Sequence, residues 1–246
     1  MKQLVAYVTA GFPDKAFTLD LIASLKESGV DKLELGIPFS DPVADGPIIE
    51  SANLKALQNG FKLETLFEIS SVASSQLETY WMGYFNPFYH KGLEQMTQKA
   101  IDLGVKGFII PDLPYEEALR YMPLMQQRHL SMINFVAPTD SKERIAHIVK
   151  QAQGFIYLVA YAGITGAHAG EDLSKTIHAI KEQSKTPVFV GFGVNEKTAK
   201  ERVKDVEGVI VGSAFVEVLL DESLSGTQKI EKIATKAKII KEKINA

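Results

Sequence analysis

The stretch from Lys32 to Pro47 reads KLELGIPFSDPVADGP, and it divides into parts with different structural preferences. Its first five residues alternate apolar and polar side chains and end in glycine, which predicts a short strand over Lys32–Gly36. Prolines and a second glycine then mark a long loop, and a pattern typical of an amphipathic helix begins at Ile48. The stretch is therefore one strand–loop–helix unit.

The same order of strand, turn and helix repeats along the whole chain. Apolar, β-branched runs that end in glycine, proline or another turn residue predict eight strands, at Leu4–Thr9, Lys32–Gly36, Thr79–Tyr84, Gly107–Pro111, Ser131–Val136, Phe155–Ala160, Pro187–Gly191 and Gly208–Gly212. Helical patterns lie at Ala16–Ser28, Ile48–Gln58, Leu63–Ser75, Leu93–Leu103, Tyr115–Arg128, Lys142–Ala152, Leu173–Gln183, Glu196–Lys204 and Gln228–Ile244.

Eight such units in ~250 residues match a closed (β/α)8 barrel, the TIM barrel, whose active site lies at the C-terminal ends of the strands. We expect residues 1–246 to form a single domain of this kind. An open, doubly wound sheet is the alternative, but a sheet of that class that binds a dinucleotide carries GxGxxG after its first strand. Here that turn reads AGFP over Ala10–Pro13, so the barrel is favoured.

Composition narrows the possible functions. With 27 basic and 30 acidic residues the net charge is −3, which gives no basic surplus for nucleic acid or an anionic membrane. Because the chain has no cysteine, it contains no disulfide, thiolate nucleophile or cysteine-bound zinc. The apolar start at Leu4–Thr9 is better explained as a first strand than as a signal peptide, so we expect a cytoplasmic protein.

Two carboxyl groups in the quoted stretch are candidates for acid–base catalysis. Strand alternation places Leu33 and Leu35 on one face and Glu34 on the other, toward the barrel interior. A carboxyl group among apolar neighbours has a raised pKa and can exchange protons near neutral pH. The alternative is an ion pair between Glu34 and Lys32 on the same face. Asp45 lies on the following loop, which can fold back over the same end of the barrel.

Glycine-rich turns after the seventh and eighth strands are candidates for a phosphate site. They read GFGVN from Gly191 and GSAF from Gly212, and each leads toward a helix whose N-terminal N–H groups can bind an anion. Neither turn contains lysine or arginine, so backbone donors would have to bind the phosphate. The alternative is a turn that needs glycine only for close packing.

Three further segments follow predicted strands. The loop over residues 161–170 contains three glycines and His168, and is a candidate lid or an ordinary flexible connection. The aromatic segment Trp81–Tyr89 would line a pocket or cap the core. The turn PDLP at residues 111–114 is rigid but otherwise ambiguous. No metal is expected, because the histidines lack paired metal spacing and are better explained as surface residues: His90, His129, His147, His168 and His178.

Several motifs closely resemble those of the tryptophan synthase α-subunit family. They are LELGIPFSDPVADGP at residues 33–47, YFNP at 84–87, PDLP at 111–114, YLVAYAGITG at 157–166, GFGV at 191–194 and VGSA at 211–214. The resemblance runs in order along nearly the whole chain. The sequence departs from the common pattern at Ala160, where serine is frequent, and at Tyr7, where phenylalanine is frequent.

This resemblance implies a retro-aldol lyase that cleaves indole-3-glycerol phosphate to indole and glyceraldehyde 3-phosphate without metal or organic cofactor. Glu34 would be the acid–base group and Asp45 would bind the indole N–H. The residues implied around the substrate are Tyr7, Met82, Tyr84, Pro111, Tyr157 and Thr165. Those implied around its phosphate are Gly166, Phe192, Gly193, Gly212 and Ser213.

The family also implies a partner. It works in an α2β2 heterotetramer with a β subunit that holds pyridoxal phosphate, and indole passes to that subunit. Asp41, Pro42 and Asn86 would face the partner. Two alternatives remain: another phosphosugar aldolase or isomerase, marked by a lysine or a glutamate–histidine pair at strand ends, and a catalytically minor barrel that mainly activates a partner.

Overall fold

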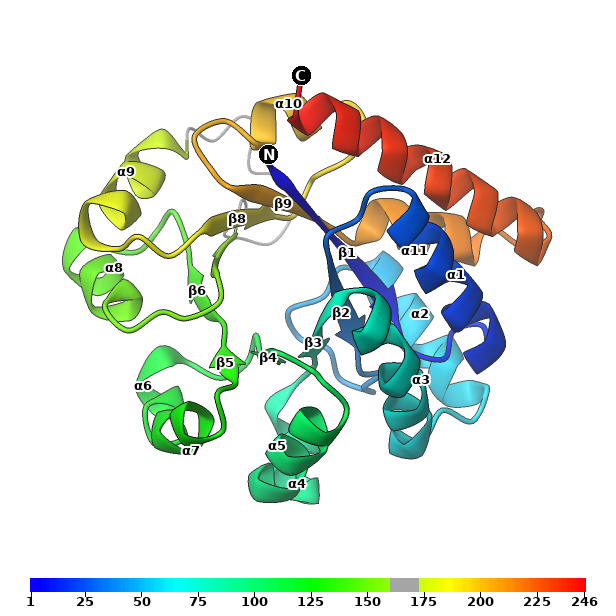
Figure 1. The fold of residues 1–246 in the computed structure, drawn as a ribbon, viewed down its shortest axis with the longest axis horizontal. Helices are drawn as coiled ribbons and strands as arrows, with labels where there is room; N and C mark the ends of the chain where they lie inside the picture. The colour runs from blue at the N-terminus through cyan, green and yellow to red at the C-terminus, as the bar shows by residue number, and fades with distance from the viewer. Residues whose placement is uncertain (160–172) are drawn as a thin grey trace.

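The computed structural model describes residues 1–159 and 173–246, in which parallel strands are surrounded by helices (Figure 1). The strands are β1 (Gln3–Thr9), β2 (Lys32–Gly36), β3 (Glu78–Met82), β4 (Gly107–Ile109), β5 (Ser131–Met132), β6 (Asn134–Val136), β7 (Ile156–Val159), β8 (Val188–Gly191) and β9 (Gly208–Val211). The helices are α1 (Lys15–Glu27), α2 (Pro47–Gln58), α3 (Leu63–Gln76), α4 (Phe85–Lys91), α5 (Leu93–Asp102), α6 (Tyr115–Ala118), α7 (Met122–Gln127), α8 (Lys142–Val149), α9 (Ser174–Gln183), α10 (Ala199–Arg202), α11 (Ser213–Leu220) and α12 (Gly226–Ile244).

The strands follow one another around a barrel. Their order is β5-β4-β3-β2-β1-β9-β8-β7-β6, and every paired strand is parallel to its neighbour. Only Ile133 separates β5 from β6, and its N–H donates to the carbonyl of Phe108 at 2.9 Å. The two pieces are therefore the single predicted strand Ser131–Val136, whose first half pairs with β4 and whose second half pairs with β7. The expected TIM barrel is confirmed.

Alternation along the strands divides the core into two layers. Residues such as Leu33, Leu35 and Trp81 pack between the sheet and the helices. The intervening residues fill the barrel interior, where the buried cluster consists of Val5, Tyr80, Ile109, Ile133, Phe155, Tyr157, Phe189 and Ile210. The interior is thus a packed core, as barrel geometry requires.

Large rings in the interior occupy space left by glycines on neighbouring strands. A β-carbon added to Gly36 would lie 2.3 Å from the hydroxyl oxygen of Tyr7, and one added to Gly191 would lie 2.3 Å from the ring of Tyr157. Real β-carbons do not approach other atoms this closely, so each tyrosine needs its glycine. This pairing of large and small residues lets Tyr7 on β1 and Tyr157 on β7 pack in the barrel.

Three helical segments differ from the prediction. Phe85–Lys91 forms α4, which the aromatic pattern concealed; the Asp112 carboxylate accepts from the N–H of Phe85 at 2.8 Å at its start. The predicted helix Tyr115–Arg128 is two helices, α6 and α7, because Pro123 in the first turn of α7 has no N–H to continue a helix from α6. The GSAF turn leads directly into α11, as predicted, although no separate helix was predicted over Ser213–Leu220.

The ends of the chain meet at the N-terminal side of the barrel. The N–H of Lys2 donates to the Asn245 side-chain oxygen at 2.8 Å, and α12 begins with a capping box formed by Ser225 and Gln228. Among the helices of the described residues, none has the length and apolar character needed to span a bilayer.

Replacing Gly36 by alanine should destabilise the barrel by about 1–3 kcal/mol, because the new methyl group overlaps the Tyr7 ring. Gly46→Ala is the control, since nothing lies within 4 Å of its β-carbon position and its φ is −79°. Urea unfolding of the two variants measures the difference. Equal stabilities would contradict the proposed fit between Tyr7 and Gly36.

Candidate active site

Glu34 lies inside the barrel, on the face that the strand pattern predicts. It pairs in register with Tyr7 on β1 and with Tyr80 on β3, and only 1% of its surface is exposed. Its neighbours along the strand, Leu33 and Leu35, are in the outer layer. The closed barrel therefore surrounds a carboxyl group with aromatic side chains.

This environment favours the protonated acid. Burial, followed by the negative charge of Asp45, raises the pKa of Glu34 to about 8. Its Oε1 has no hydrogen-bond partner among the residues that the structure describes. The alternative ion pair with Lys32 is wrong, because the Lys32 ammonium lies 2.6 Å from Oε2 of Glu78. At pH 7 the protonated form of Glu34 is therefore favoured, and its Oε1 is unpaired within the described residues.

Asp45 is held over the same end of the barrel by side chains from two other elements. Asn53 on α2 donates to its Oδ2 at 3.2 Å, and the Tyr84 hydroxyl forms a second hydrogen bond with it. Burial raises the pKa of Asp45 to about 6, although these two hydrogen bonds lower it. The loop itself is fixed by Tyr84, whose hydroxyl accepts from the N–H of Ala44 at 3.0 Å and whose ring stacks on Phe39.

Tyr7 and Tyr157 are two further side chains that lie around the carboxyl groups of Glu34 and Asp45. Burial raises the pKa of both hydroxyls well above the ordinary value, and the charges of Glu34 and Asp45 raise it further. Because Coulomb interactions weaken with distance, these effects indicate that Tyr7, Tyr157, Glu34 and Asp45 lie close together. Phe135 stacks on Tyr157 with ring centroids 4.9 Å apart.

The two turns predicted to bind phosphate lie beside Tyr157 and Tyr7. Phe192 and Gly193 both have positive φ, at 70° and 67°, and the Phe192 ring contacts Tyr157 with centroids 6.3 Å apart. The β-carbon position of Gly212 is 3.6 Å from that of Tyr7. The N–H groups of Gly193 and Ser213 form no hydrogen bond with the described part of the chain, so they can bind an anion.

Arg202 adds a cation that neither turn contains. Its Nη2 lies 3.8 Å from the β-carbon position of Gly193, and its side chain makes no ion pair with residues 1–159 or 173–246. Arg202 could not be assigned to the turn from the sequence, because it follows Gly193 by nine positions. A terminal arginine on a four-residue helix has no pattern that marks it.

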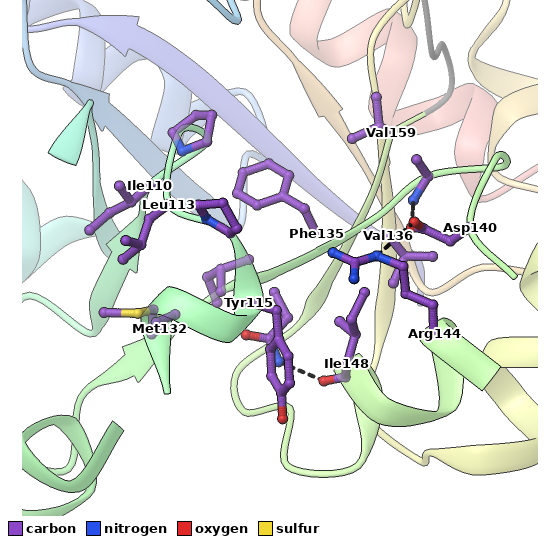
Figure 2. A pocket seen from close by; sticks show the side chains of 16 residues that line it. Ile110, Leu113, Tyr115, Met132, Phe135, Val136, Asp140, Arg144, Ile148 and Val159 are labelled. Atoms are coloured by element: carbon purple, nitrogen blue, oxygen red, sulfur yellow. Dashed lines mark hydrogen bonds and ion pairs between the residues drawn. The ribbon is translucent and has the colours of Figure 1, made fainter. Parts of the chain in front are cut away.

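A cavity of about 200 Å³ opens beside β4 and β6 (Figure 2). Phe135 and Val159 line it from β6 and β7 and Pro111 from the turn after β4, while Tyr115 and Ile148 line it from α6 and α8. It lies where β4 pairs with β5 but not with β6, so the gap in the ladder leaves room between the strand ends. Its lining also includes the polar side chains of Asn134, Asp140 and Arg144, and it contains neither Glu34 nor Asp45.

The remaining predicted site residues are spread more widely. Met82 ends β3 and is half-buried beside the interior cluster. Asp41 and Asn86 are exposed, whereas Pro42 is buried. Thr165 and Gly166 lie outside the described residues, as do His168 and the rest of the predicted lid.

The described histidines and strand-end residues supply no further metal-binding or catalytic group. The four described histidines are all exposed, as predicted: His90, His129, His147 and His178. Within the described residues there is no group of three or more histidine, aspartate or glutamate side chains suited to a metal. None of the described strands ends in lysine or histidine, the mark of the alternative aldolase or isomerase.

Asn53 is the other important residue that the sequence analysis missed. It is 1% exposed and lies between Ala52 and Ala56 on the buried face of α2. A polar amide on the apolar face of a predicted helix was the available signal, because such a group needs a hydrogen-bond partner.

Known proteins share this barrel from end to end. Residues 1–245 match the family described as "Tryptophan synthase alpha chain". The chain is 57% identical to the tryptophan synthase alpha chain of Wolinella succinogenes, over 100% of this chain and 97% of that relative. It is similar to the structure of tryptophan synthase subunit alpha from Campylobacter jejuni, with a TM-score of 0.86, 33% identity, and coverage of 96% and 95% of the two chains. A structure of the tryptophan synthase a2b2 complex from Pyrococcus furiosus matches with a TM-score of 0.84, 31% identity, and coverage of 98% and 100%.

The raised pKa of Glu34 makes stability depend on pH. Between the ordinary value of 4.5 and about 8 the folded chain binds more protons than the unfolded chain, so the free energy of unfolding falls as pH rises. Glu34→Gln removes this contribution. We therefore expect the stability of the variant relative to wild type to increase between pH 5 and 8, at a limiting slope of about 1.4 kcal/mol per pH unit.

Urea unfolding at several pH values measures this difference. Glu27→Gln, which removes an exposed carboxyl group on α1, is the control for loss of a charge. A constant difference between wild type and Glu34→Gln from pH 5 to 8 would show that Glu34 ionises as it does in water.

Proposed function

The chain belongs to the family of tryptophan synthase alpha chains, and from that premise we propose how its residues carry out the family's reaction. The reaction is the retro-aldol cleavage of indole-3-glycerol phosphate to indole and D-glyceraldehyde 3-phosphate in L-tryptophan biosynthesis. The chain is thus a carbon–carbon lyase. The observation on which the proposed mechanism depends is the burial of Glu34, whose Oε1 has no hydrogen-bond partner among the described residues.

Glu34 would act first as an acid and then as a base. In its neutral form it donates its proton to C3 of the indole ring, which places a positive charge on the ring nitrogen. The resulting carboxylate then takes the proton of the glycerol hydroxyl next to the ring. The carbon–carbon bond breaks, indole and the aldehyde form, and Glu34 is again protonated. A pKa of about 8 suits this cycle, because both forms are accessible near neutral pH.

Asp45 would stabilise the cationic intermediate. As a carboxylate it accepts the indole N–H and offsets the positive charge that develops on the ring. The hydrogen bonds from Asn53 and Tyr84 favour its ionised form and fix its direction. The two carboxyl groups thus have different environments and different roles, which is how acid and base functions are separated in one site.

Surrounding residues would bind the two ends of the substrate. Tyr7, Met82, Tyr84, Pro111, Tyr157 and Thr165 are proposed to border the indole and the reacting carbons. Phe192, Gly193, Gly212 and Ser213, with Gly166 from outside the described residues, are proposed to bind the phosphate through backbone N–H groups. The free N–H groups of Gly193 and Ser213 support this assignment.

The partner is proposed to be a tryptophan synthase β subunit in an α2β2 assembly, as in the Pyrococcus furiosus complex. Pyridoxal phosphate would belong to that subunit, and the alpha reaction needs no cofactor. Asp41, Pro42 and Asn86 would contact the partner; two of them are exposed, while buried Pro42 would shape the loop. We also propose that residues 1–246 are one domain and that the protein works in the cytoplasm.

Substitution of the two carboxyl groups tests the mechanism. Glu34→Gln should lower indole release from indole-3-glycerol phosphate by about 10²–10⁴-fold, because proton transfer in the transition state is lost. Asp45→Asn should lower it as well, because the amide carries no charge to stabilise the intermediate. Wild type and both variants are assayed with and without a β subunit.

We expect weak wild-type activity that rises with the partner and is lost in Glu34→Gln. Glu27→Gln controls for the removal of a carboxyl group elsewhere. Unchanged indole release from Glu34→Gln would instead favour a barrel whose main task is to activate its partner.

Arg202 should contribute to phosphate binding at a distance. Its guanidinium lies against Gly193, so Arg202→Leu should raise KM about two- to fivefold with little change in kcat. Arg128→Leu removes an arginine at the C-terminal end of α7, away from the site, and serves as the control. If both variants have the wild-type KM, Arg202 does not act on the phosphate.

A further inference from the structure

Three polar side chains form a network in the barrel next to Glu34. The Lys32 ammonium lies 2.6 Å from Oε2 of Glu78, and the Tyr80 hydroxyl donates to Oε1 of Glu78 at 2.7 Å. The Lys32 side chain is 12% exposed and that of Glu78 is 39% exposed. The mechanism proposed above uses none of these three residues.

The network engages two hydrogen-bond donors that lie close to Glu34 in the sheet. Lys32 precedes Glu34 by two residues on the same strand and the same face. Tyr80 is the register partner of Glu34 on β3, and Lys32 is the register partner of Glu78. Both donors therefore start beside Glu34, yet both bind the carboxylate one layer nearer the N-terminal ends of the strands.

We propose that Glu78 is a positioning residue for the reaction: by binding the Lys32 ammonium and the Tyr80 hydroxyl, it keeps both hydrogen-bond donors away from the Glu34 carboxyl group. This inference rests on the acid–base role proposed for Glu34. It deepens that role by naming the residue that keeps the acid unpaired.

The ionisable groups around Glu34 agree with the proposal that it is left without a hydrogen-bond donor. Asp45, Tyr7, Tyr157, Tyr80 and Lys32 are the ionisable groups near Glu34, and none of them donates a hydrogen bond to its Oε1 within the described residues.

The neighbours of Glu78 lower its pKa and so favour its ionised form. Burial raises this pKa, but hydrogen bonds from Lys32 and Tyr80, together with the charges of Lys32 and Lys106, leave it below the ordinary value. Burial and the bond to Glu78 raise the pKa of the Tyr80 hydroxyl, which therefore stays a donor. Glu78 is thus stabilised as an anion, whereas Glu34 is left as a neutral acid.

Removal of the Glu78 charge should release Lys32 toward Glu34. An opposite charge within ~4–6 Å lowers a carboxyl pKa by about 1–3, so in Glu78→Gln the titration midpoint of Glu34 should fall by about one pH unit or more. The second variant, Glu78→Gln with Lys32→Met, should recover the wild-type midpoint because the ammonium is gone. Lys32→Met alone should not lower the midpoint, because it removes a positive charge and leaves the negative charge of Glu78 uncompensated.

Carbon-13 NMR of the full chain with labelled glutamate carboxyl groups measures these midpoints. The Glu34 signal is identified by its absence from Glu34→Gln. Glu207→Gln is the matched control, because Glu207 forms a comparable ion pair with Lys181, at 2.8 Å, and accepts a backbone N–H near the start of β8. Its loss should not move the Glu34 midpoint.

Each outcome has one meaning. A lowered midpoint in Glu78→Gln that recovers in the double variant supports the proposal. An unchanged or raised midpoint in Glu78→Gln, or a midpoint that falls in Lys32→Met alone, overturns it, and Lys32→Met can be measured even if Glu78→Gln does not fold. The titration needs no substrate, so it is independent of the proposed activity. If Glu34→Gln still released indole, the catalytic role would fail while the measured titration stood.

Discussion

The closed barrel places the Glu34 carboxyl group where it has almost no contact with water. Aromatic side chains from β1, β3 and β7 surround it, and no ion pair with it is formed by residues 1–159 or 173–246. Burying a carboxylate without a partner costs several kcal/mol, so the group remains protonated and its pKa rises to about 8. The tyrosines, the glycines that accommodate them and the ion pair of Lys32 with Glu78 all serve to maintain this state.

The second carboxyl group depends on a different constraint. Asp45 lies on a loop, and a loop side chain has no fixed direction unless other elements hold it. Here Asn53 from α2 and Tyr84 from the end of β3 bind it, and the same Tyr84 hydroxyl accepts a backbone N–H of the loop. One ring thus fixes both the loop and the carboxyl group, which explains why a predicted substrate contact has a structural task as well.

Most of the fold could be predicted from the sequence, because strand and helix periods are local properties of the chain. The exceptions were positions where a local pattern had two solutions. Ile133 interrupts the fifth strand as it changes partner from β4 to β7. The aromatic segment after β3 forms the helix α4, and Pro123 divides one predicted helix into two. In each case the apolar content was correct and the backbone path was decided by a neighbour or by proline.

For the site, the sequence by itself determined which side of β2 carries Glu34, since alternation along a strand allows no other arrangement once Leu33 and Leu35 face the helices. It also placed the glycine turns at the C-terminal ends of β8 and β9. Only the tertiary structure decided that Lys32 binds Glu78, that Asn53 binds Asp45 and that Arg202 lies against Gly193. The physical reason is that each contact joins two different elements, even where the residues are only eight or nine positions apart, and strand register and helix packing, which no local pattern encodes, bring those elements together.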